Sequence, residues 1–356
     1  MKNYPENISP VLPVEIVLHP SWWHKNTGII FDEDFFYHPL KRVESERRME
    51  QELYDRFGKF GLGRDHDRDL PVIGPVHNAA GYIISEMLGC RVDYNAGSPP
   101  RIHPLECDEL QLNQESAFQS PVFKKLQNLI NSLTWKYGNV TGDVNWSGVL
   151  NVAMDVRGNN ILTDMMIQPE ETARYFLDIA GVLEKFTGYI YSCTRSTSVS
   201  VNRAVRHLNK PVLLHSECSH TMIDAASYEQ FLLPIDIAWS LRSQSYGIHY
   251  CGQDSHRFAR LYSNIPLLDF LDVGWGGNIA EIRKYLPNTF LNIRLDPVTL
   301  NQYTPEEIRK TIIRLVDESG NINLTGICCI NLDDRIQDQK INTIFETCSE
   351  CRMSVK

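Results

Sequence analysis

The second half of the chain alternates short apolar runs with segments of helical character. Apolar runs occupy 211–218, 245–251, 267–275, 289–297 and 323–330, and helix-forming segments separate them. Strands of this length that alternate with helices are typical of a parallel sheet buried on both faces. The alternation therefore predicts an α/β fold and constrains the architecture more than any other feature of the sequence.

The first half is less regular but supplies further candidate strands at 70–75, 91–95 and 140–146. With these, roughly eight strands are expected, and we predict a single (β/α)8 TIM barrel with an N-terminal helical and aromatic extension. Amphipathic periodicity and helix-start signals, a proline with acidic residues in the first turn, predict the main helices. These are expected at 40–57, 120–137, 169 onward, 225–242 with a bend near Pro234, 304–318 and 342–351.

We expect three parts along the chain. Residues 1–68 form an N-terminal extension packed on the barrel, 69–347 form the barrel, and 348–356 form a C-terminal tail. Within the extension, residues 19–38 are rich in aromatic side chains and histidine. The histidine spacing there fits no compact metal-ligand pattern, so this segment is predicted to cover one end of the barrel.

Composition excludes several classes of protein. The net charge of −9 over 356 residues comes without a long basic run, which argues against a nucleic-acid-binding surface. The sequence has no apolar run of 18 residues and no signal peptide at its start, so we expect no membrane span and a cytoplasmic protein. Nine cysteines without disulfide spacing are then expected to be reduced thiols, available for metal binding or catalysis.

Polar residues cluster at the carboxyl ends of the predicted strands. In a (β/α)8 barrel the active site lies at that end, so these tips are expected to share one site. The residues concerned are Asp143, Glu217, His249 with Cys251, Trp275, Asp296 and Cys328.

His249 and Cys251 are the best candidates for metal ligands. Side chains two apart on a strand point to the same face, and imidazole and thiolate both suit zinc. A third ligand is expected from the pair Cys328 and Cys329 at another strand tip, with Cys328 preferred. The alternative is two buried, inert thiols beside a hydrogen-bonded core histidine. The spacing Cys348-x-x-Cys351 is interpreted as incidental, although a redox role stays open.

From about residue 70 to the end, the ordered set of strand tips resembles the uroporphyrinogen decarboxylase superfamily. The matching segments are 140–158, 168–179, SYEQFLLP at 227–234, IHYCG at 248–252, DFLDVGW at 269–275, LNIRLDP at 291–297, YTPEEI at 303–308 and LTGICCIN at 324–331. The arginine-rich substrate segment of the decarboxylase itself has no counterpart here. The resemblance is therefore to the zinc-containing branch, the cobamide-dependent methyltransferases similar to methylcobalamin:coenzyme M methyltransferase.

This resemblance implies a zinc site and a methyl-transfer reaction. The branch carries His-x-Cys followed much later by a cysteine, and His249, Cys251 and Cys328 fit that pattern, with 328 − 251 = 77 positions between the thiols. Zn²⁺ would activate a thiol or a methylated substrate, and a corrinoid (cobamide) carried by a partner protein would give or take the methyl group. A small thiol or methylated compound is the implied substrate.

Further site residues follow from their place at the predicted strand ends. Glu217 is our candidate catalytic residue, as a fourth ligand that leaves when substrate arrives or as a carboxylate that orients His249; it could equally pair with a neighbouring base. The expected substrate pocket contains His77, His215, Asp254 and Trp275, each of which has an alternative role as an ordinary structural group.

Two rival functions stay open at this stage. One is a metal-free lyase similar to uroporphyrinogen decarboxylase on the same barrel. The other is a non-catalytic partner of a corrinoid protein.

Overall fold

The computed structural model describes residues 11–69, 71–73, 81–142, 147–195, 208, 210 and 212–354. The strands are β1 (Val14–Leu18), β2 (Val72–Ile73), β3 (Arg91–Asn95), β4 (Ser98–His103), β5 (Thr141–Gly142), β6 (Leu213–Glu217), β7 (Tyr246–Tyr250), β8 (Leu268–Val273), β9 (Phe290–Arg294) and β10 (Thr325–Leu332). The α-helices are α1 (Pro20–Thr27), α2 (Glu33–Tyr37), α3 (Pro39–Phe57), α4 (Ile83–Met87), α5 (Gln114–Gln119), α6 (Pro121–Tyr137), α7 (Val149–Arg157), α8 (Asn160–Ile167), α9 (Pro169–Thr194), α10 (Ala225–Phe231), α11 (Leu233–Arg242), α12 (Ala259–Tyr262), α13 (Ile279–Tyr285), α14 (Pro297–Gln302), α15 (Pro305–Ser319) and α16 (Asp338–Met353).

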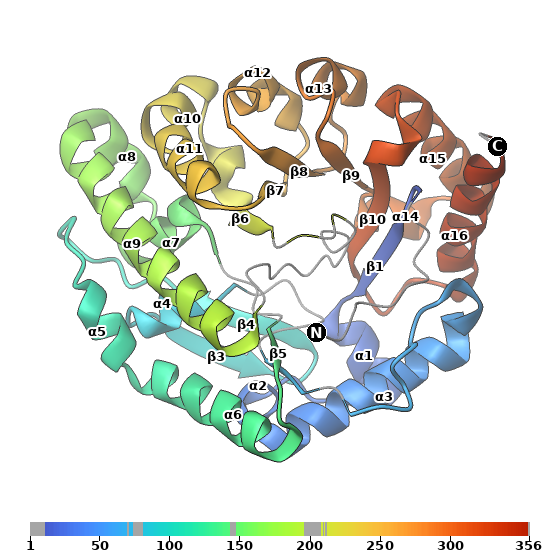
Figure 1. Ribbon diagram of the computed structural model, residues 1–356, viewed down its shortest axis with the longest axis horizontal. Helices are drawn as coiled ribbons and strands as arrows, with labels where there is room; N and C mark the ends of the chain where they lie inside the picture. Colours follow the sequence, from blue (N-terminus) through green and yellow to red (C-terminus); the bar gives the residue numbers. More distant parts are fainter. Residues whose placement is uncertain are drawn as a thin grey trace.

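The centre of the molecule is a six-stranded parallel sheet in the order β1-β10-β9-β8-β7-β6. The sheet curls, and helices α10 to α16 lie along its outer side (Figure 1). Four of its strands, β7 to β10, are almost continuously buried, as expected for a parallel sheet covered on both faces. The alternation that begins near residue 211 is thus confirmed as an α/β arrangement.

A second parallel pair, β2 with β5, lies on the open side of the curl. Among the described residues, no backbone pairing joins this pair to the six-stranded sheet. The structure therefore shows a half-barrel with a separate strand pair. The expected closed ring of eight strands would need further pairing between β2–β5 and the six-stranded sheet, which the described residues do not make.

Strand β1 belongs to the sheet itself. Residues Val14 to Leu18 pair with β10, from Val14 opposite Ile327 to Leu18 opposite Leu332. Residues 1–68 were expected to form an extension packed on the barrel. Strand β1 lies within that range and forms one edge of the central sheet. Elsewhere, β4 pairs antiparallel with β3.

The helix-start signals in the sequence are confirmed at two helices. At α15 the Thr304 hydroxyl accepts a hydrogen bond from the Glu307 backbone N–H. The Glu307 carboxylate in turn accepts one from the Thr304 backbone N–H, which completes a capping box. At α9, Pro169 occupies the first turn with Glu170 and Glu171, where acidic groups favour the positive end of the helix dipole. The bend expected near Pro234 separates α10 from α11.

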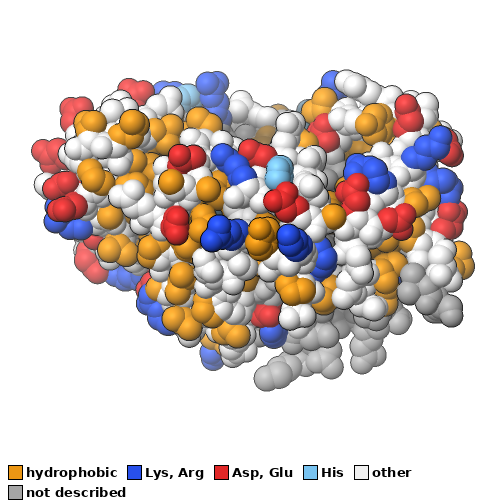
Figure 2. Space-filling model, turned by 90° about the horizontal axis from the view of Figure 1, so that it is seen from above, with side chains coloured by type: hydrophobic (Ala, Val, Ile, Leu, Met, Phe, Trp, Pro, Cys, Tyr) orange, Lys and Arg blue, Asp and Glu red, His pale blue; other side chains and the backbone are white. Residues whose placement is uncertain are grey.

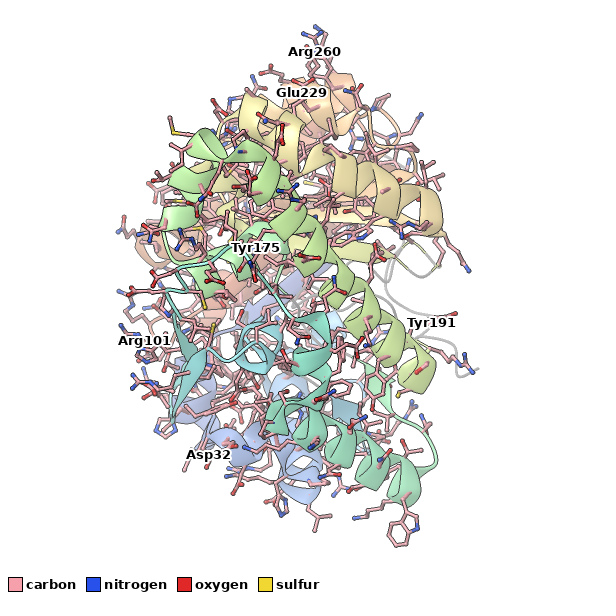
Figure 3. The ribbon with its side chains drawn as sticks, turned by 90° about the vertical axis from the view of Figure 1, so that its left-hand side faces the viewer. Asp32, Arg101, Tyr175, Tyr191, Glu229 and Arg260 are labelled. Atoms are coloured by element: carbon pink, nitrogen blue, oxygen red, sulfur yellow. The ribbon has the colours of Figure 1, made fainter. Side chains whose placement is uncertain are left out.

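Helix α9 is the longest helix and packs on the side of the molecule away from β10. Figure 3 shows Tyr175 near the start of α9 and Tyr191 near its end, with Asp32 at the opposite extreme of the molecule from Glu229 and Arg260. Tyr175, Phe176, Ile179 and Leu183 line the buried side of α9. Contacts between α9 and α7 fix α7 against the end of β6, which matters for the site described next.

Candidate metal centre

Three potential metal ligands come together at the carboxyl ends of β6 and β7. The ligand atoms of Cys218, His249 and Cys251 all lie within 4.8 Å of one another. Two thiols and one imidazole form a donor set that suits zinc, which prefers sulfur and nitrogen ligands. The residues present therefore fit the metal that the resemblance implied, and they fit it at the barrel end where catalysis is expected.

Each of these candidate ligands lies in a strand or directly after one. His249 lies in β7 and Cys251 follows the last residue of that strand, so their side chains share a face as the spacing predicted. Cys218 begins the 3₁₀ turn Cys218–Met222 directly after β6, the neighbour of β7 in the sheet. The backbone after β7 and the backbone after β8 approach each other closely at Gly252 and Gly274. A Cβ on Gly274 would stand 1.8 Å from the Gly252 carbonyl oxygen, so the approach requires glycine there.

The His249 ring is oriented by Asp272. His249 and Asp272 are register partners on β7 and β8, and the Asp272 carboxylate accepts a hydrogen bond from His249 Nδ1. With Nδ1 occupied, Nε2 is the nitrogen left for a metal, and a carboxylate partner of this kind fixes the tautomer of a ligating histidine. Burial lowers the pKa of His249, but the nearby Asp272 carboxylate outweighs it and raises the pKa to about 9.

Cys251 lies between another thiol and a buried guanidinium. Arg294 Nη1 donates a hydrogen bond to Cys251 Sγ over 2.9 Å. A hydrogen bond from Cys218 lowers the pKa of Cys251 most, and His249 and Arg294 lower it further against the effect of burial. The same pairing raises the pKa of Cys218 well above its usual value. The surroundings thus favour a thiolate at Cys251, the form that binds metal.

Trp275 lies beside the same cluster. The guanidinium carbon of Arg294 stands 5.7 Å from the centroid of the Trp275 ring. Arg294 is itself almost wholly buried, and its Nε lacks a hydrogen-bond partner in the described part of the chain. Trp275, one of the residues expected in the substrate pocket, therefore contacts the same Arg294 side chain that is bonded to Cys251.

The structure places Cys328 outside the three-ligand group. Its thiol is buried and donates to Asp272 Oδ1 over 3.7 Å, so the Asp272 carboxylate lies between Cys328 and His249. Cys329 points to the other face of β10, where its thiol approaches the Leu295 carbonyl over 3.5 Å within the apolar core. Of the two adjacent cysteines, Cys328 thus faces the site. Its assignment as a ligand stays a prediction, in competition with Cys218.

The Glu217 carboxylate caps the start of α7. Its Oε1 accepts hydrogen bonds from the backbone N–H of Leu150 at 3.0 Å and of Asn151 at 3.4 Å. Burial raises the pKa of Glu217 to about 7. The carboxylate that orients His249 is Asp272, so that alternative for Glu217 is corrected. Its other oxygen lies 3.7 Å from Nε2 of buried His220, close to the pairing with a neighbouring base that the sequence left open.

The remaining predicted pocket residues have separate environments. His215 is fully buried and bonded through Nδ1 to Asp236 at 2.7 Å, while its Nε2 accepts the Val149 backbone N–H at 3.2 Å. Asp254 accepts a hydrogen bond from the Tyr250 hydroxyl and forms an ion pair with Arg257 at 3.2 Å. Both match the ordinary structural alternative. His77 and Asp143 lie outside the described residues.

A separate cavity of about 330 Å³ lies at the opposite ends of β6 and β7. Leu213, at the start of β6, and Gln244, just before β7, line it together with Tyr191, Trp239 and Arg242. Catalytic groups of α/β barrels gather at the carboxyl ends of the strands, and the two thiols and His249 lie there rather than here. We therefore place the candidate site at the cluster and not in this cavity.

The surface is mixed in charge. On the face shown in Figure 2, acidic and basic side chains alternate with small apolar patches around a hollow in the outline, without a single-sign stripe. Within the described chain, every helix is too short or too polar to cross a lipid bilayer.

Solved structures show which proteins share this architecture. A methyltransferase from Methanosarcina mazei superposes with a TM-score of 0.68 over 98% of this chain and 96% of that one, at 11% sequence identity. The chain shares its fold with a methyltransferase. A B12-independent methionine synthase from Shewanella sp. W3-18-1, in complex with selenomethionine, matches with a TM-score of 0.53 over 98% and 99% of the two chains, at 8% identity. No family model and no curated protein matches the sequence.

Sequence reasoning did not assign three residues of the cluster: Cys218, Asp272 and Arg294. Signals for two of them were present. Cys218 follows a predicted strand whose neighbour carries His249, and Asp272 lies within DFLDVGW, on the next strand along the chain. Only the register, which sets His249 opposite Asp272 and Ser216 opposite His249, turns these positions into contacts.

Proposed function

We propose that this protein is a zinc-dependent methyltransferase that moves a methyl group between a corrinoid and a small thiol or methylated substrate. The observation that carries the proposal is the convergence of Cys218, His249 and Cys251 at the strand ends of a fold shared with a methyltransferase. We take the strand pair β2–β5 and the six-stranded sheet together as one eight-stranded barrel whose mouth holds this cluster.

In this proposal His249, Cys251 and one further thiol hold Zn²⁺, with Cys218 favoured by distance and Cys328 as the competing candidate. Three protein ligands with a fourth position open to substrate is the arrangement of catalytic rather than structural zinc. The metal would supply Lewis acidity, keeping a substrate thiol deprotonated near neutral pH or polarising the heteroatom of a methylated substrate.

The surrounding side chains prepare the site. Asp272 holds His249 through Nδ1 and leaves Nε2 available, so the ring would need no reorientation when the metal binds. Arg294 offsets the negative charge of Cys251 and keeps its sulfur in place. Trp275 shields the outer side of Arg294 and would form a wall of the substrate pocket. Under this proposal Glu217 acts by holding the end of β6 against α7.

The corrinoid is proposed to arrive on a partner protein that docks over the strand ends. The Methanosarcina protein is described simply as a methyltransferase, and the Shewanella protein is described as B12-independent. The corrinoid assignment therefore depends on the resemblance in sequence and is open to direct test.

Two measurements test the proposal. Elemental analysis of the purified protein is expected to give about one zinc per chain, as a single catalytic site requires. Incubation with methylcobalamin and 2-mercaptoethanol is expected to transfer the methyl group to the thiol and to leave demethylated cobalamin. The absorption spectrum of the cobalamin measures this change. The reverse direction is followed with cobalt(I) cobalamin and methylated thiols or amines. Full methyl transfer by protein that holds no zinc would refute the metal assignment, and zinc-loaded protein inert toward every corrinoid assay would refute the methyltransferase.

A further inference from the structure

The first backbone N–H groups of α7, which lack a partner within the helix, are bonded by the end of β6. The first N–H groups of a helix have no partner within it, and α7 has no side-chain cap of its own. Here Gly148 N–H donates to Ser216 O at 2.6 Å, Val149 N–H to His215 Nε2, and Leu150 N–H to Glu217 Oε1. The strand that leads to Cys218 is therefore the cap of α7.

Asn151 extends this junction past Cys218. Its side-chain Nδ2 donates to the Ser216 carbonyl oxygen over 2.9 Å, and its Oδ1 accepts the Ser219 backbone N–H over 2.8 Å. One amide thus bonds the backbone on both sides of the residue pair Glu217 and Cys218. It mimics the two hydrogen bonds that a neighbouring strand would make.

Cys218 needs such a restraint more than the other cluster members do. His249 lies within a buried strand with Asp272 on its ring, and Cys251 is held by Arg294. Cys218 is the exposed member of the three and begins a 3₁₀ turn, where strand pairing no longer sets its direction. The two hydrogen bonds of Asn151 are the contacts that flank it on either side.

We infer that Asn151 is a positioning residue that holds the Cys218 thiol within bonding reach of His249 and Cys251. The inference rests on the proposed function for its metal, but the positioning contacts are made by protein groups alone. Asn151 acts through the backbone of Ser216 and Ser219 and does not touch the metal or the substrate. Loss of its side chain leaves its own backbone bond to Glu217 in place.

Cobalt(II) titration of the metal-free protein tests the inference. Cobalt is a spectroscopic substitute for zinc, and absorption from thiolate to cobalt reports how many sulfurs bind. Asn151→Ala is expected to weaken cobalt binding by about 10–100-fold, the usual effect of removing a residue that supports a ligand, and to reduce the thiolate absorption. In a Cys218→Ser background the same substitution is expected to add no further loss, because the two changes then act on one ligand.

Asn113→Ala is the matched control. Asn113 is also an asparagine whose Oδ1 accepts backbone N–H groups, here of Glu115 and Ser116 at the start of α5, on a different part of the molecule from the cluster. It is expected to lose stability in a urea titration without a change in cobalt affinity or spectrum. An Asn151→Ala protein that binds cobalt like the parent, or that loses the same affinity with and without Cys218, would overturn the inference.

A second readout needs no metal. Diamide oxidises two adjacent thiols to a disulfide: each thiol gives up one proton and one electron, and the N=N bond of the reagent is reduced to a hydrazine. In metal-free protein a Cys218–Cys251 disulfide is expected to form quickly in the parent and in Asn113→Ala, and slowly in folded Asn151→Ala, as measured by peptide mass. If Asn151→Ala oxidises slowly but the parent protein binds no metal, the positioning role of Asn151 stands and the proposed function is refuted. Equal oxidation rates would refute the positioning role alone.

Discussion

Two buried histidines of the sheet are each bonded through Nδ1 to an aspartate, yet their roles differ. His249 on β7 gives Nδ1 to Asp272, and His215 on β6 gives Nδ1 to Asp236. In both pairs the carboxylate raises the histidine pKa against the effect of burial. The pairs differ at the second ring nitrogen, and that nitrogen decides what each histidine can do.

At His215, Nε2 accepts the Val149 backbone N–H, so the ring caps α7 and has no lone pair left for a ligand. At His249, a ring nitrogen lies within 4.8 Å of two thiols, and no backbone donor bonds Nε2 among the described residues. Asp236 also accepts from the hydroxyls of Tyr228 and Tyr246, which makes the first pair part of a closed buried network. A histidine–aspartate pair thus becomes a candidate metal ligand only where its far nitrogen stays open.

Removal of a thiol beside His249 should give the largest effect. Cys251→Ser is expected to lose zinc almost completely, a larger effect than the about 100-fold that loss of a supporting residue can cause, because a ligand itself is gone. Elemental analysis and circular dichroism measure metal content and folding. Cys193→Ser, a half-buried thiol on α9, is the control and should retain its zinc. A folded Cys251→Ser protein with full zinc would remove Cys251 from the role of ligand.

The third ligand can be assigned by two further serine variants. Cys218→Ser is expected to lose zinc, whereas Cys328→Ser should retain most of it, because the Cys328 thiol is bonded to Asp272 rather than grouped with His249. Zinc content per chain is the measurement. The reverse result would return the third position to Cys328, as the sequence alone suggested, and would mean that Asp272 moves aside when metal binds.

The capping histidine should show its role in stability instead. His215→Ala is expected to lower the free energy of unfolding by about 3 kcal/mol, because it leaves Asp236 buried without its main partner and uncaps α7. Urea titration measures this loss. The control is His103→Ala, which breaks an exposed histidine–aspartate pair with Asp93 and should change stability by less than about 0.5 kcal/mol. Equal losses in the two variants would contradict the comparison.

Loss of the carboxylate bonded to His249 should weaken metal binding less than loss of a ligand does. Asp272→Ala is expected to weaken zinc binding by about 10–100-fold while leaving the ligands in place. Competition against a chelator of known affinity measures the change. Asp269→Ala removes a carboxylate of the same strand that bonds Lys210 and Ser245 away from the cluster, and zinc affinity should not change. If both variants bind zinc alike, Asp272 does not orient His249.

The sequence predicted the local parts of this architecture well. Proline and acidic residues at the start of α9, the capping box of α15 and the apolar runs of β7 to β10 are local patterns, and local patterns set helices and strands. Strand β1 was missed because its pattern, VEIVL, is short and gains its stability from pairing with β10 at the far end of the chain.

The sequence by itself determined that His249 and Cys251 share one face at the end of one strand, because two-residue periodicity is a property of the backbone. It also separated Cys328 from Cys329 onto opposite faces by the same rule. Only the tertiary structure decided which distant residues complete the group. Register between strands set Asp272 beside His249, and the junction of β6 with α7 set Cys218 beside Cys251. Such contacts depend on how far neighbouring strands are shifted against each other, and no pattern within a single strand encodes that shift.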